Sequence, residues 1–283
     1  VTIRTFGNTD GYLAKFASNG NFVWIRQIGG ASVDFVYGIT IDKDGNVAVS
    51  GTVNSAAVFG SGSNAKELIA QSGYDAFIAK YTNDGDFVWV QAAGGVNNDQ
   101  ATSVATDAAG NIYMAGLFYG GVFGTGADAQ TVGDALSITG GAGQDAFLAK
   151  YGPTGRLLWV RTLAGVSSDQ FNSVVVDSSG YVYAGGYFNL SATVSGGGQS
   201  QTLSSQGGTD AALAKFTSDG TLVWARTMGS ASGDLISGVG IGSSGSVAVM
   251  GTINYDLPAT GGGAVISLGS QAKTLTSQGT NDI

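Results

Sequence analysis

The sequence has 283 residues, with 12 basic and 20 acidic side chains, a formal net charge of −8, and neither cysteine nor histidine. Without those two residue types, Ser-His-Asp and Cys-His catalysis, Cys/His zinc sites and haem or iron–sulfur ligation are excluded. The small number of Lys and Arg excludes nucleic acid as a partner, because few phosphates could be neutralised. No apolar run reaches about 18 residues, so membrane insertion is not expected. The first residues lack a basic-then-apolar signal pattern, which predicts a mature chain or an excised segment.

In chain order, the first strand-like stretches are Gly11–Phe16 and Asn21–Gln27, and a set of four follows. That set consists of Tyr37–Asp42, Asn46–Val53, Asp75–Tyr81 and Asp86–Ala92. Val, Ile, Phe, Tyr and Trp dominate these stretches, and Asn, Asp and Gly bound them, which predicts β-strands joined by hairpins. The last comparable pair is Ile236–Ile241 and Ser246–Ile253. No stretch combines a helical period with capping residues, so an all-β chain is predicted.

Internal repetition is the strongest signal in the sequence. The four tryptophans are separated by 65, 70 and 65 residues, and we call them the Trp column: Trp24, Trp89, Trp159 and Trp224. The same steps separate the members of a Lys column: Lys15, Lys80, Lys150 and Lys215. They also separate the members of an Asp column: Asp34, Asp99, Asp169 and Asp234. Repeat units therefore start near residues 10, 75, 145 and 210.

Four antiparallel strands per repeat at a fixed period describe the blade of a β-propeller, so a single propeller domain of four repeats over residues 1–283 is predicted. The strand pairs at the two ends complete a blade, either within the chain or between subunits. The segment Lys273–Ile283 resembles Thr2–Tyr12, so the same piece of the repeat occurs twice. A closed ring needs one copy, and the duplicate favours head-to-tail pairing into rings or filaments. Both arrangements remain open.

The repeats also carry specific motifs, namely DAFIAKYTNDGDFVWVQAAGG at Asp75–Gly95 and DAAGNIYMAG at Asp107–Gly116. These motifs resemble the bacterial β-propeller repeat called SBBP, and the likeness recurs in every copy. The last copy departs from the pattern, because Gly242–Gly251 lacks the turn aspartate. The resemblance implies a β-propeller fold in a large protein that is secreted or exposed on a surface.

All the variation in repeat length lies between the second and third strands, in polar inserts rich in Gly and Ser. Loops on a rigid scaffold often carry binding sites, so the face with these inserts is a candidate binding face for a glycan or a protein. Its aromatic side chains are candidates for stacking on sugars, but covering the edges of blades is the favoured role for scattered aromatics. These side chains are Tyr119, Phe123, Tyr187, Phe188 and Tyr255.

One turn resembles the start of a calcium loop, with oxygen-bearing side chains at alternate positions. Its candidate ligands are Asp42, Asp44 and Asn46, and calcium is the only cofactor considered. The equivalent turns of other repeats lose acidic residues, and too few carboxylates are present for a full calcium shell. An Asx-type hairpin turn without metal is therefore the favoured interpretation.

Each lysine of the Lys column lies in an otherwise apolar strand, where an unpaired charge is costly. We expect a structural ion pair with a carboxylate, and the Asp column is the first candidate for the partner. The alternative is a ring of four aspartates that binds a cation or a polyol. Because catalytic sites rarely occur once in every repeat, the Trp, Lys and Asp columns are predicted to be structural.

The sequence contains no constellation that predicts an enzyme. Glu67 is the only glutamate, no carboxylate pair is singled out for glycoside hydrolysis, and no Ser–Lys motif is present. The sequence predicts instead an extracellular or cell-surface structural or adhesive protein that self-associates or binds another surface protein or glycan. The alternative is a glycan- or protein-binding module. A charged content of 11% means weak repulsion between copies, which favours self-association.

Overall fold

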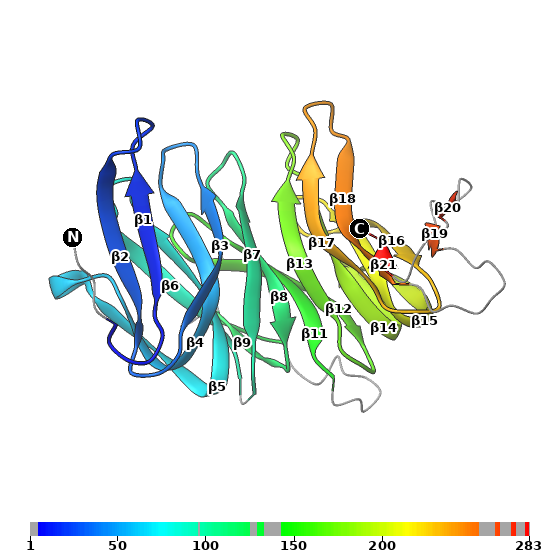
Figure 1. The fold of residues 1–283 in the computed structure, drawn as a ribbon, viewed down its shortest axis with the longest axis horizontal. Coiled ribbons are helices and arrows are strands. Elements are labelled where there is room, and N and C mark those ends of the chain that lie inside the picture. The colour runs from blue at the N-terminus through cyan, green and yellow to red at the C-terminus, as the bar shows by residue number, and fades with distance from the viewer. Residues whose placement is uncertain are drawn as a thin grey trace. The chain divides into compact units, whose positions relative to one another are not determined.

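The computed structural model describes residues 5–95, 97–124, 129–132, 143–254, 264–266, 273–275 and 281–282. Antiparallel β-strands dominate these ranges, and the one helical element within them is a short 3-10 turn, Gly62–Asn64 (η1) (Figure 1). The prediction of an all-β chain is therefore confirmed. The arrangement of the repeats around a propeller axis stays a prediction.

The described residues group into two compact units. Unit 1 takes them from 1–114, 118–133 and 149–158, and unit 2 from 115–117, 134–148 and 159–283. The strands β11 and β12, whose bounds follow below, are divided between the two units. A single domain over residues 1–283 stays a prediction.

The strands occur in the predicted order of four per repeat. First strands are β3 (Phe35–Ile41), β7 (Gln100–Thr106), β13 (Gln170–Val176) and β17 (Asp234–Ile241). Second strands are β4 (Val47–Phe59), β8 (Ile112–Phe118), β14 (Val182–Gly196) and β18 (Val247–Asn254). Third strands are β1 (Gly11–Phe16), β5 (Lys66–Tyr81), β11 (Asp145–Tyr151) and β15 (Gln199–Phe216). Fourth strands are β2 (Phe22–Gly30), β6 (Phe87–Gly94), β12 (Leu157–Gly165) and β16 (Leu222–Gly229).

Short strands fill the inserts and the last part of the chain. They are β9 (Gly121–Phe123), β10 (Gln130–Val132), β19 (Ala264–Ile266), β20 (Lys273–Leu275) and β21 (Asn281–Asp282).

Tight turns join the first strand of each repeat to the second. In the β3–β4 turn, the Gly45 N–H donates to the Asp42 carbonyl at 3.0 Å, and Gly45 has a φ of +80°. Glycine adopts this left-handed conformation without a steric cost, which explains why it recurs at this place in every repeat.

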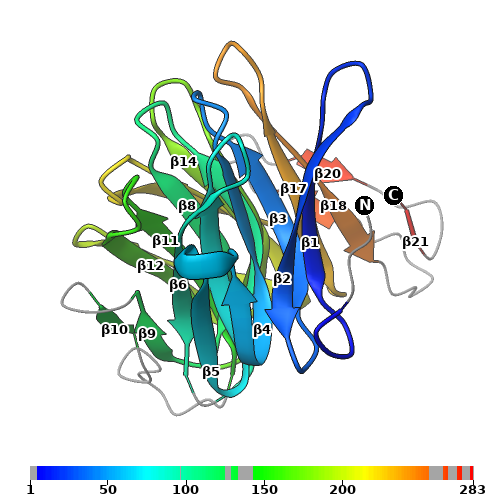
Figure 2. The same ribbon diagram turned by 90° about the vertical axis from the view of Figure 1, so that its left-hand side faces the viewer.

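Within the described residues, the inserts contain paired β-strands where the sequence suggested loops. In unit 1, β4 and β5 pair from Val47↔Tyr81 to Asn54↔Tyr74, and after a register shift they pair again to Phe59↔Lys66. Ser55 lies in that shift with a φ of +67°. Glu67 is an exposed residue of β5. Figure 2 shows η1 (cyan) between the two strands of this ribbon.

Each ribbon also pairs with the fourth strand of the preceding repeat. The register partners are Gly29↔Val58 (β2–β4), Ala93↔Phe123 (β6–β9), Thr162↔Ser195 (β12–β14) and Met228↔Ile266 (β16–β19). Main-chain pairing therefore continues from one repeat into the next. This is why the inserts are regular although their sequences vary.

The core of unit 1 is mainly aliphatic and aromatic, and β1, β2, β4, β5 and β6 supply its residues. Phe59 packs edge-on against Phe77 with ring centroids 4.9 Å apart, and Ile28 and Val49 complete the same buried cluster. Gly51 has no room for a side chain there, because an added Cβ would lie 2.0 Å from the Phe35 carbonyl oxygen. The close approach of β3 to β4 thus explains a recurring strand glycine.

Candidate functional site

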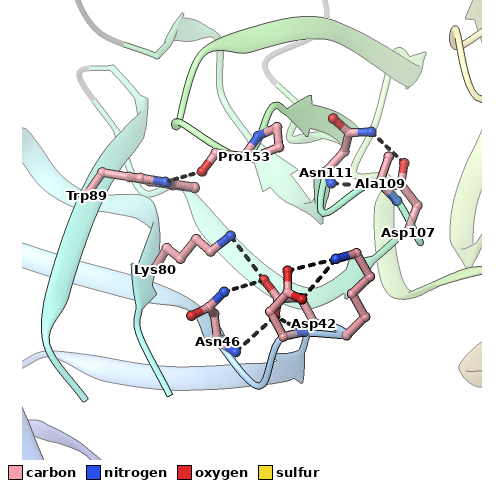
Figure 3. A network of polar contacts seen from close by, with 10 residues as sticks. Asp42, Asn46, Lys80, Trp89, Asp107, Ala109, Asn111 and Pro153 are labelled. Carbon is pink, nitrogen blue, oxygen red and sulfur yellow. Dashed lines mark hydrogen bonds and ion pairs between the residues drawn. The ribbon is translucent and has the colours of Figure 1, made fainter. Parts of the chain in front are cut away.

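The Trp column joins each repeat to the next one. The indole N–H of Trp24 donates to the Asn83 carbonyl at 3.1 Å, and that of Trp89 donates to the Pro153 carbonyl at 3.0 Å (Figure 3). In unit 2, the Trp159 indole N–H donates to a turn carbonyl in the same way, at 3.3 Å. Each acceptor lies in the turn between the third and fourth strands of the next repeat, so the Trp column is structural in these three copies.

A second residue of this contact was missed at the sequence level. Arg26 stacks over Trp24, with its Cζ 5.3 Å from the ring centroid, and donates from Nε to the Gly85 carbonyl at 2.6 Å. Arg161 stacks over Trp159 in the same way, at 5.1 Å, and its Nε donates to the Gly220 carbonyl at 2.6 Å. The signal was available, because an arginine follows three of the four tryptophans by two residues.

Two lysines of the Lys column pair with a carboxylate, but these carboxylates do not belong to the Asp column. Lys80 Nζ lies 3.1 Å from Asp42 Oδ2 in the turn of its own repeat, and both side chains are buried (Figure 3). Lys150 lies 3.6 Å from the equivalent Asp107. The expectation of a structural ion pair is met here, and the expected partner was wrong because strand pairing brings the lysine over the turn aspartate.

The turn aspartate uses both of its oxygens, which leaves the candidate calcium ligands without a suitable shell. Asp42 Oδ1 accepts the N–H groups of Asp44 and Asn46, and Oδ2 accepts the Asn46 amide and faces Lys80. Asp44 instead pairs with exposed Lys43 at 2.9 Å. Burial alone would raise the pKa of Asp42, but the hydrogen bonds from Asn46, Lys80 and Asp44 hold that pKa below its ordinary value. The geometry is that of an Asx turn capped by a lysine.

The remaining lysines of the column have other partners. Lys215 lies over the rings of Tyr181 and Tyr183, with Nζ 3.8 and 5.1 Å from their centroids, a cation–π contact. Lys15 donates to the Asn83 carbonyl at 2.8 Å and also to the Asn83 amide oxygen. The fourth turn has Gly242 where the others have aspartate.

The Asp column holds backbone and faces no cation among the described residues. Asp99 accepts the Gly95 N–H at 2.9 Å and the Tyr119 N–H at 2.8 Å, and Asp34 and Asp234 make the equivalent bonds. These bonds tie the loop after the fourth strand to the end of the following second strand. The predicted alternative, a ring of four aspartates that binds a cation or a polyol, has no counterpart in these contacts.

A second aspartate lies beside each member of the Asp column. The Cβ that Gly94 lacks would be 2.7 Å from Asp99 Oδ2 and 2.8 Å from Asp75 Oδ1, so both carboxylates face one glycine. Asp75 Oδ2 accepts the Gln71 N–H at 3.0 Å, whereas Oδ1 has no hydrogen-bond partner among the described residues. Burial raises the pKa of Asp75 to about 6, and burial together with the Asp75 charge raises the pKa of Asp99 to about 7.

The aromatic candidates of the insert face are mostly unavailable to a ligand. Phe123 and Phe188 are fully buried, so their rings are not available to stack on a sugar and line the interior. Tyr187 is half-buried, and its hydroxyl donates to Gln170 Oε1 at 3.1 Å. Tyr119 is also half-buried, and Tyr255 lies outside the described residues. The sequence could not separate these roles, because the inserts give no sign that they pair as strands.

Two strands lack a partner that their equivalents in the inner repeats have. Within the described residues, β1 is hydrogen-bonded to β2 alone, and β18 pairs with β17 and, at Ile253 and Asn254 only, with β21. Equivalent positions show the consequence for burial. Phe216 in β15 is 0% exposed, whereas Phe16 in β1 is 60% exposed, and Val49 is 0% exposed, whereas Val249 is 36% exposed.

Each open edge borders an apolar groove. The groove beside β1 has a volume of about 570 Å³ and is lined by β1 and β3, with Leu13, Phe35 and Tyr37 among its walls. The groove beside β18 has a volume of about 470 Å³ and is lined by residues that include Met228 and Ile236. We call these surfaces the β1 edge and the β18 edge, and they are the candidate functional site.

The fold and the repeated contacts of the Trp, Lys and Asp columns define the class of protein. It is an all-β protein built from a four-stranded antiparallel repeat. Comparison with known proteins makes the class specific, because residues 23–56 match the beta-propeller repeat family SBBP. The matched segment runs from the end of one repeat, through Asp34, to the second strand of the next. The predicted resemblance to this repeat family is confirmed over residues 23–56.

Two known proteins are similar to the chain. An uncharacterized WD repeat-containing protein of Acanthamoeba polyphaga mimivirus is 28% identical over 214 residues, which are 68% of this chain and 15% of that protein. The regulatory protein FlaEY of Caulobacter vibrioides is 26% identical over 177 residues, 61% of this chain and 18% of FlaEY. The chain thus spans less than a fifth of the length of either relative.

The described part of the chain contains no helix with the length and hydropathy needed to cross a membrane. Nor do its residues include a group of three or more acidic side chains arranged to hold a metal ion.

Proposed function

We propose that this chain is a non-enzymatic structural or adhesive β-propeller repeat protein, outside the cell or on its surface, that associates head to tail through its β1 and β18 edges. The observation that carries the proposal is the contrast between equivalent positions, which are buried in the inner repeats and exposed at the two edges. An unpaired strand with apolar side chains is a template for another strand. The extracellular placement draws on the resemblance to the SBBP family.

The inner repeats supply the register of the proposed contact. In β4–β5, Val49 lies opposite Ala79, and the same alignment puts Val249 of β18 opposite Ala14 of β1. In this register, one copy contributes the first and second strands of a blade and the other copy contributes the third and fourth. The assembled blade would bury Phe16 and Val249 as their counterparts are buried.

The lysines fit the same register. In a completed blade Lys15 would face the turn that begins at Gly242, the one turn of the four that lacks an aspartate. The Lys15 ammonium already has a hydrogen-bond partner in the Asn83 carbonyl. The absent carboxylate and the satisfied lysine therefore match, and closing the blade would bury no unpaired charge there.

Sedimentation velocity of the purified chain over a range of concentrations tests the proposal. Wild type should form species larger than the monomer, and Val249→Lys should remain monomeric because the register would bury its charge. The matched control is Val223→Lys, since Val223 and its counterparts Val23, Val88 and Leu158 are exposed in every repeat. This control should assemble like wild type. A wild-type chain that stays monomeric up to high concentration would refute the proposed function.

A further inference from the structure

Every repeat has a buried carboxylate oxygen without a hydrogen-bond partner where two aspartates come together. Within the described ranges these oxygens are Asp10 Oδ1, Asp75 Oδ1, Asp169 Oδ2 and Asp210 Oδ1. Burial, and then the charge of the neighbouring aspartate, raises a carboxyl pKa in every pair. Buried polar atoms normally have partners, so an unpartnered oxygen that recurs in all four repeats requires a physical explanation.

The pair Asp75 and Asp99 in unit 1 shows the geometry most clearly. Asp75 is 2% exposed and Asp99 is 0% exposed, and one oxygen of each converges on the space beside Gly94. No lysine or arginine makes an ion pair with either carboxylate in the described part of the chain. From β4, the neutral Thr52 hydroxyl donates to the Asp99 carbonyl at 2.9 Å. Two like charges so close in a buried place are costly, so the pair is expected to retain a proton.

The hydrogen bonds decide which carboxyl carries that proton. Burial raises the pKa of Asp99 to about 7 and that of Asp75 to about 6, so the pair as a whole binds a proton above the ordinary range. Both oxygens of Asp99 accept N–H groups, from Gly95 and Tyr119, and a proton on either would compete with a donor. Asp75 accepts one N–H on Oδ2, from Gln71, and its Oδ1 is free to carry the proton.

We infer that Asp75 carries a proton on Oδ1 and donates it to Asp99 Oδ2, and that this shared proton is a pH-sensitive latch between the β4–β5 ribbon and the loop after β6. Asp75 Oδ2 holds the ribbon through the Gln71 N–H, and Asp99 holds the loop through the Gly95 N–H. When the proton leaves to solvent as the pH rises, two facing charges remain and the link weakens. This latch goes beyond the proposed function and does not depend on assembly.

Unit 2 contains a second pair with the same division of roles. Asp210 Oδ2 accepts the Gln206 N–H at 3.1 Å, and its Oδ1 has no partner among the described residues. Asp234 Oδ1 accepts the Asn254 N–H, and its Oδ2 accepts the N–H and the hydroxyl of Ser230. Burial, with a further contribution from the Asp234 charge, raises the pKa of Asp210 to about 6. The shared proton therefore belongs on Asp210 in this pair.

Replacing Asp75 by asparagine tests where the proton lies, because asparagine copies the protonated carboxyl. Its oxygen can accept the Gln71 N–H and its NH2 group can donate to Asp99. Wild type loses the latch as the pH rises through the raised pKa, whereas asparagine does not titrate. Asp75→Asn should therefore raise the thermal unfolding midpoint of the monomer at pH 8 by about 2–4 °C and leave the midpoint at pH 5 unchanged. Asp75→Ala makes neither bond, so it should lower the midpoint at both pH values.

Two further variants serve as matched controls. Asp86→Asn removes the same charge from an exposed residue, so it should leave the midpoint unchanged at both pH values. Asp99→Asn places an NH2 group against one of the two N–H donors that the carboxylate accepts. It should therefore lower the midpoint at pH 8, opposite to the effect of Asp75→Asn.

Amide hydrogen exchange at Gln71 gives a local readout, because its N–H donates to Asp75. After correction for the pH dependence of intrinsic exchange, protection of this amide in wild type should fall about tenfold between pH 5 and pH 8. Asp75→Asn should retain its protection over the same range. Equal losses of protection in the two proteins would contradict the latch.

The outcomes separate this inference from the proposed function. An Asp75→Asn midpoint at pH 8 that falls as far as that of Asp75→Ala would overturn the latch, because Asp75 would then act as a charged acceptor. A gain of equal size in Asp86→Asn would also overturn it, since a smaller net charge would explain the effect. All these measurements use the monomer, so a wild-type chain that fails to assemble would refute the proposed function without affecting them.

Discussion

Replacing Trp159 by alanine should lower the free energy of unfolding by about 3–5 kcal/mol, the range for removing a buried tryptophan. Trp159 is buried, its indole N–H donates to Ser218, and Arg161 stacks on its ring, so the change removes packing, a hydrogen bond and a cation–π contact together. Urea unfolding monitored by circular dichroism, at a concentration where the chain is monomeric, measures the loss.

Trp224→Ala is the matched control within the same column. Trp224 is half-buried and makes no indole hydrogen bond among the described residues, so its removal should cost about 1–2 kcal/mol in the monomer. Losses of equal size at the two positions would contradict the contribution assigned to the buried Trp159 contact.

The protein should be more stable at pH 5 than at pH 8. Burial raises the pKa of Asp75 and Asp210 to about 6, of Asp99 to about 7 and of Asp169 to about 8, against an ordinary value of 3.8. A carboxyl whose pKa is raised by folding binds its proton more tightly in the native state. Its contribution to stability is therefore complete below about pH 4 and is lost as the pH rises through the native value.

The groups that face these carboxyls act in the same direction. Asp99 faces Asp75, and the charge of Asp145 raises the pKa of Asp169 further, after the larger effect of burial. Each unit of raised pKa corresponds to about 1.4 kcal/mol. Asp42 has a lowered pKa and acts in the opposite sense, but its contribution is lost only as the pH falls through values below 3.8.

Thermal unfolding midpoints between pH 4.5 and 8.5 measure this dependence, with Asp99→Asn as the control variant. Asparagine cannot titrate, so the variant should lose less stability than wild type over that range. It should also be less stable at every pH, because the Gly95 and Tyr119 N–H groups bond to different carboxylate oxygens and the asparagine NH2 group would replace one of these acceptors with a donor. Wild-type midpoints that rise from pH 5 to pH 8 would contradict the buried carboxyl pairs.

Local features of the fold were predictable from the sequence. A turn glycine such as Gly45 is required by its own backbone conformation, and the strand it starts is marked by β-branched and aromatic residues, so spacing and composition were sufficient. The predicted Asp86–Ala92 strand, for example, is β6 at Phe87–Gly94. The structural role of the Trp column was also predictable, because a tryptophan recurs at the same place in every repeat.

Features that depend on partners distant in the sequence were not predictable. The inserts that follow β4 and β14 form strands because these strands continue into ribbons that pair with the preceding repeat. The sequence of an insert does not indicate that partner. The choice of Asp42 rather than Asp34 as the partner of Lys80 follows from strand register, which composition does not encode. The full burial of Phe188 was not predictable for the same reason, since it depends on neighbouring strands.

The central claim is that β18 of one copy pairs with β1 of another, and disulfide trapping tests it most directly. The natural chain has no cysteine, so chains carrying Ala14→Cys can be mixed with chains carrying Val249→Cys and oxidised gently. Directly opposed residues of antiparallel strands lie close enough for a disulfide. A mixture of Ala14→Cys with Val223→Cys is the mismatched control.

The account predicts a mixed disulfide dimer from Ala14→Cys with Val249→Cys, formed faster than in the control mixture. The double variant, with both cysteines in one chain, should then give a ladder of cross-linked oligomers. A double variant that forms only an internally cross-linked monomer, together with no dimer in the mixture, would show that the chain closes its own blade and would contradict assembly between copies.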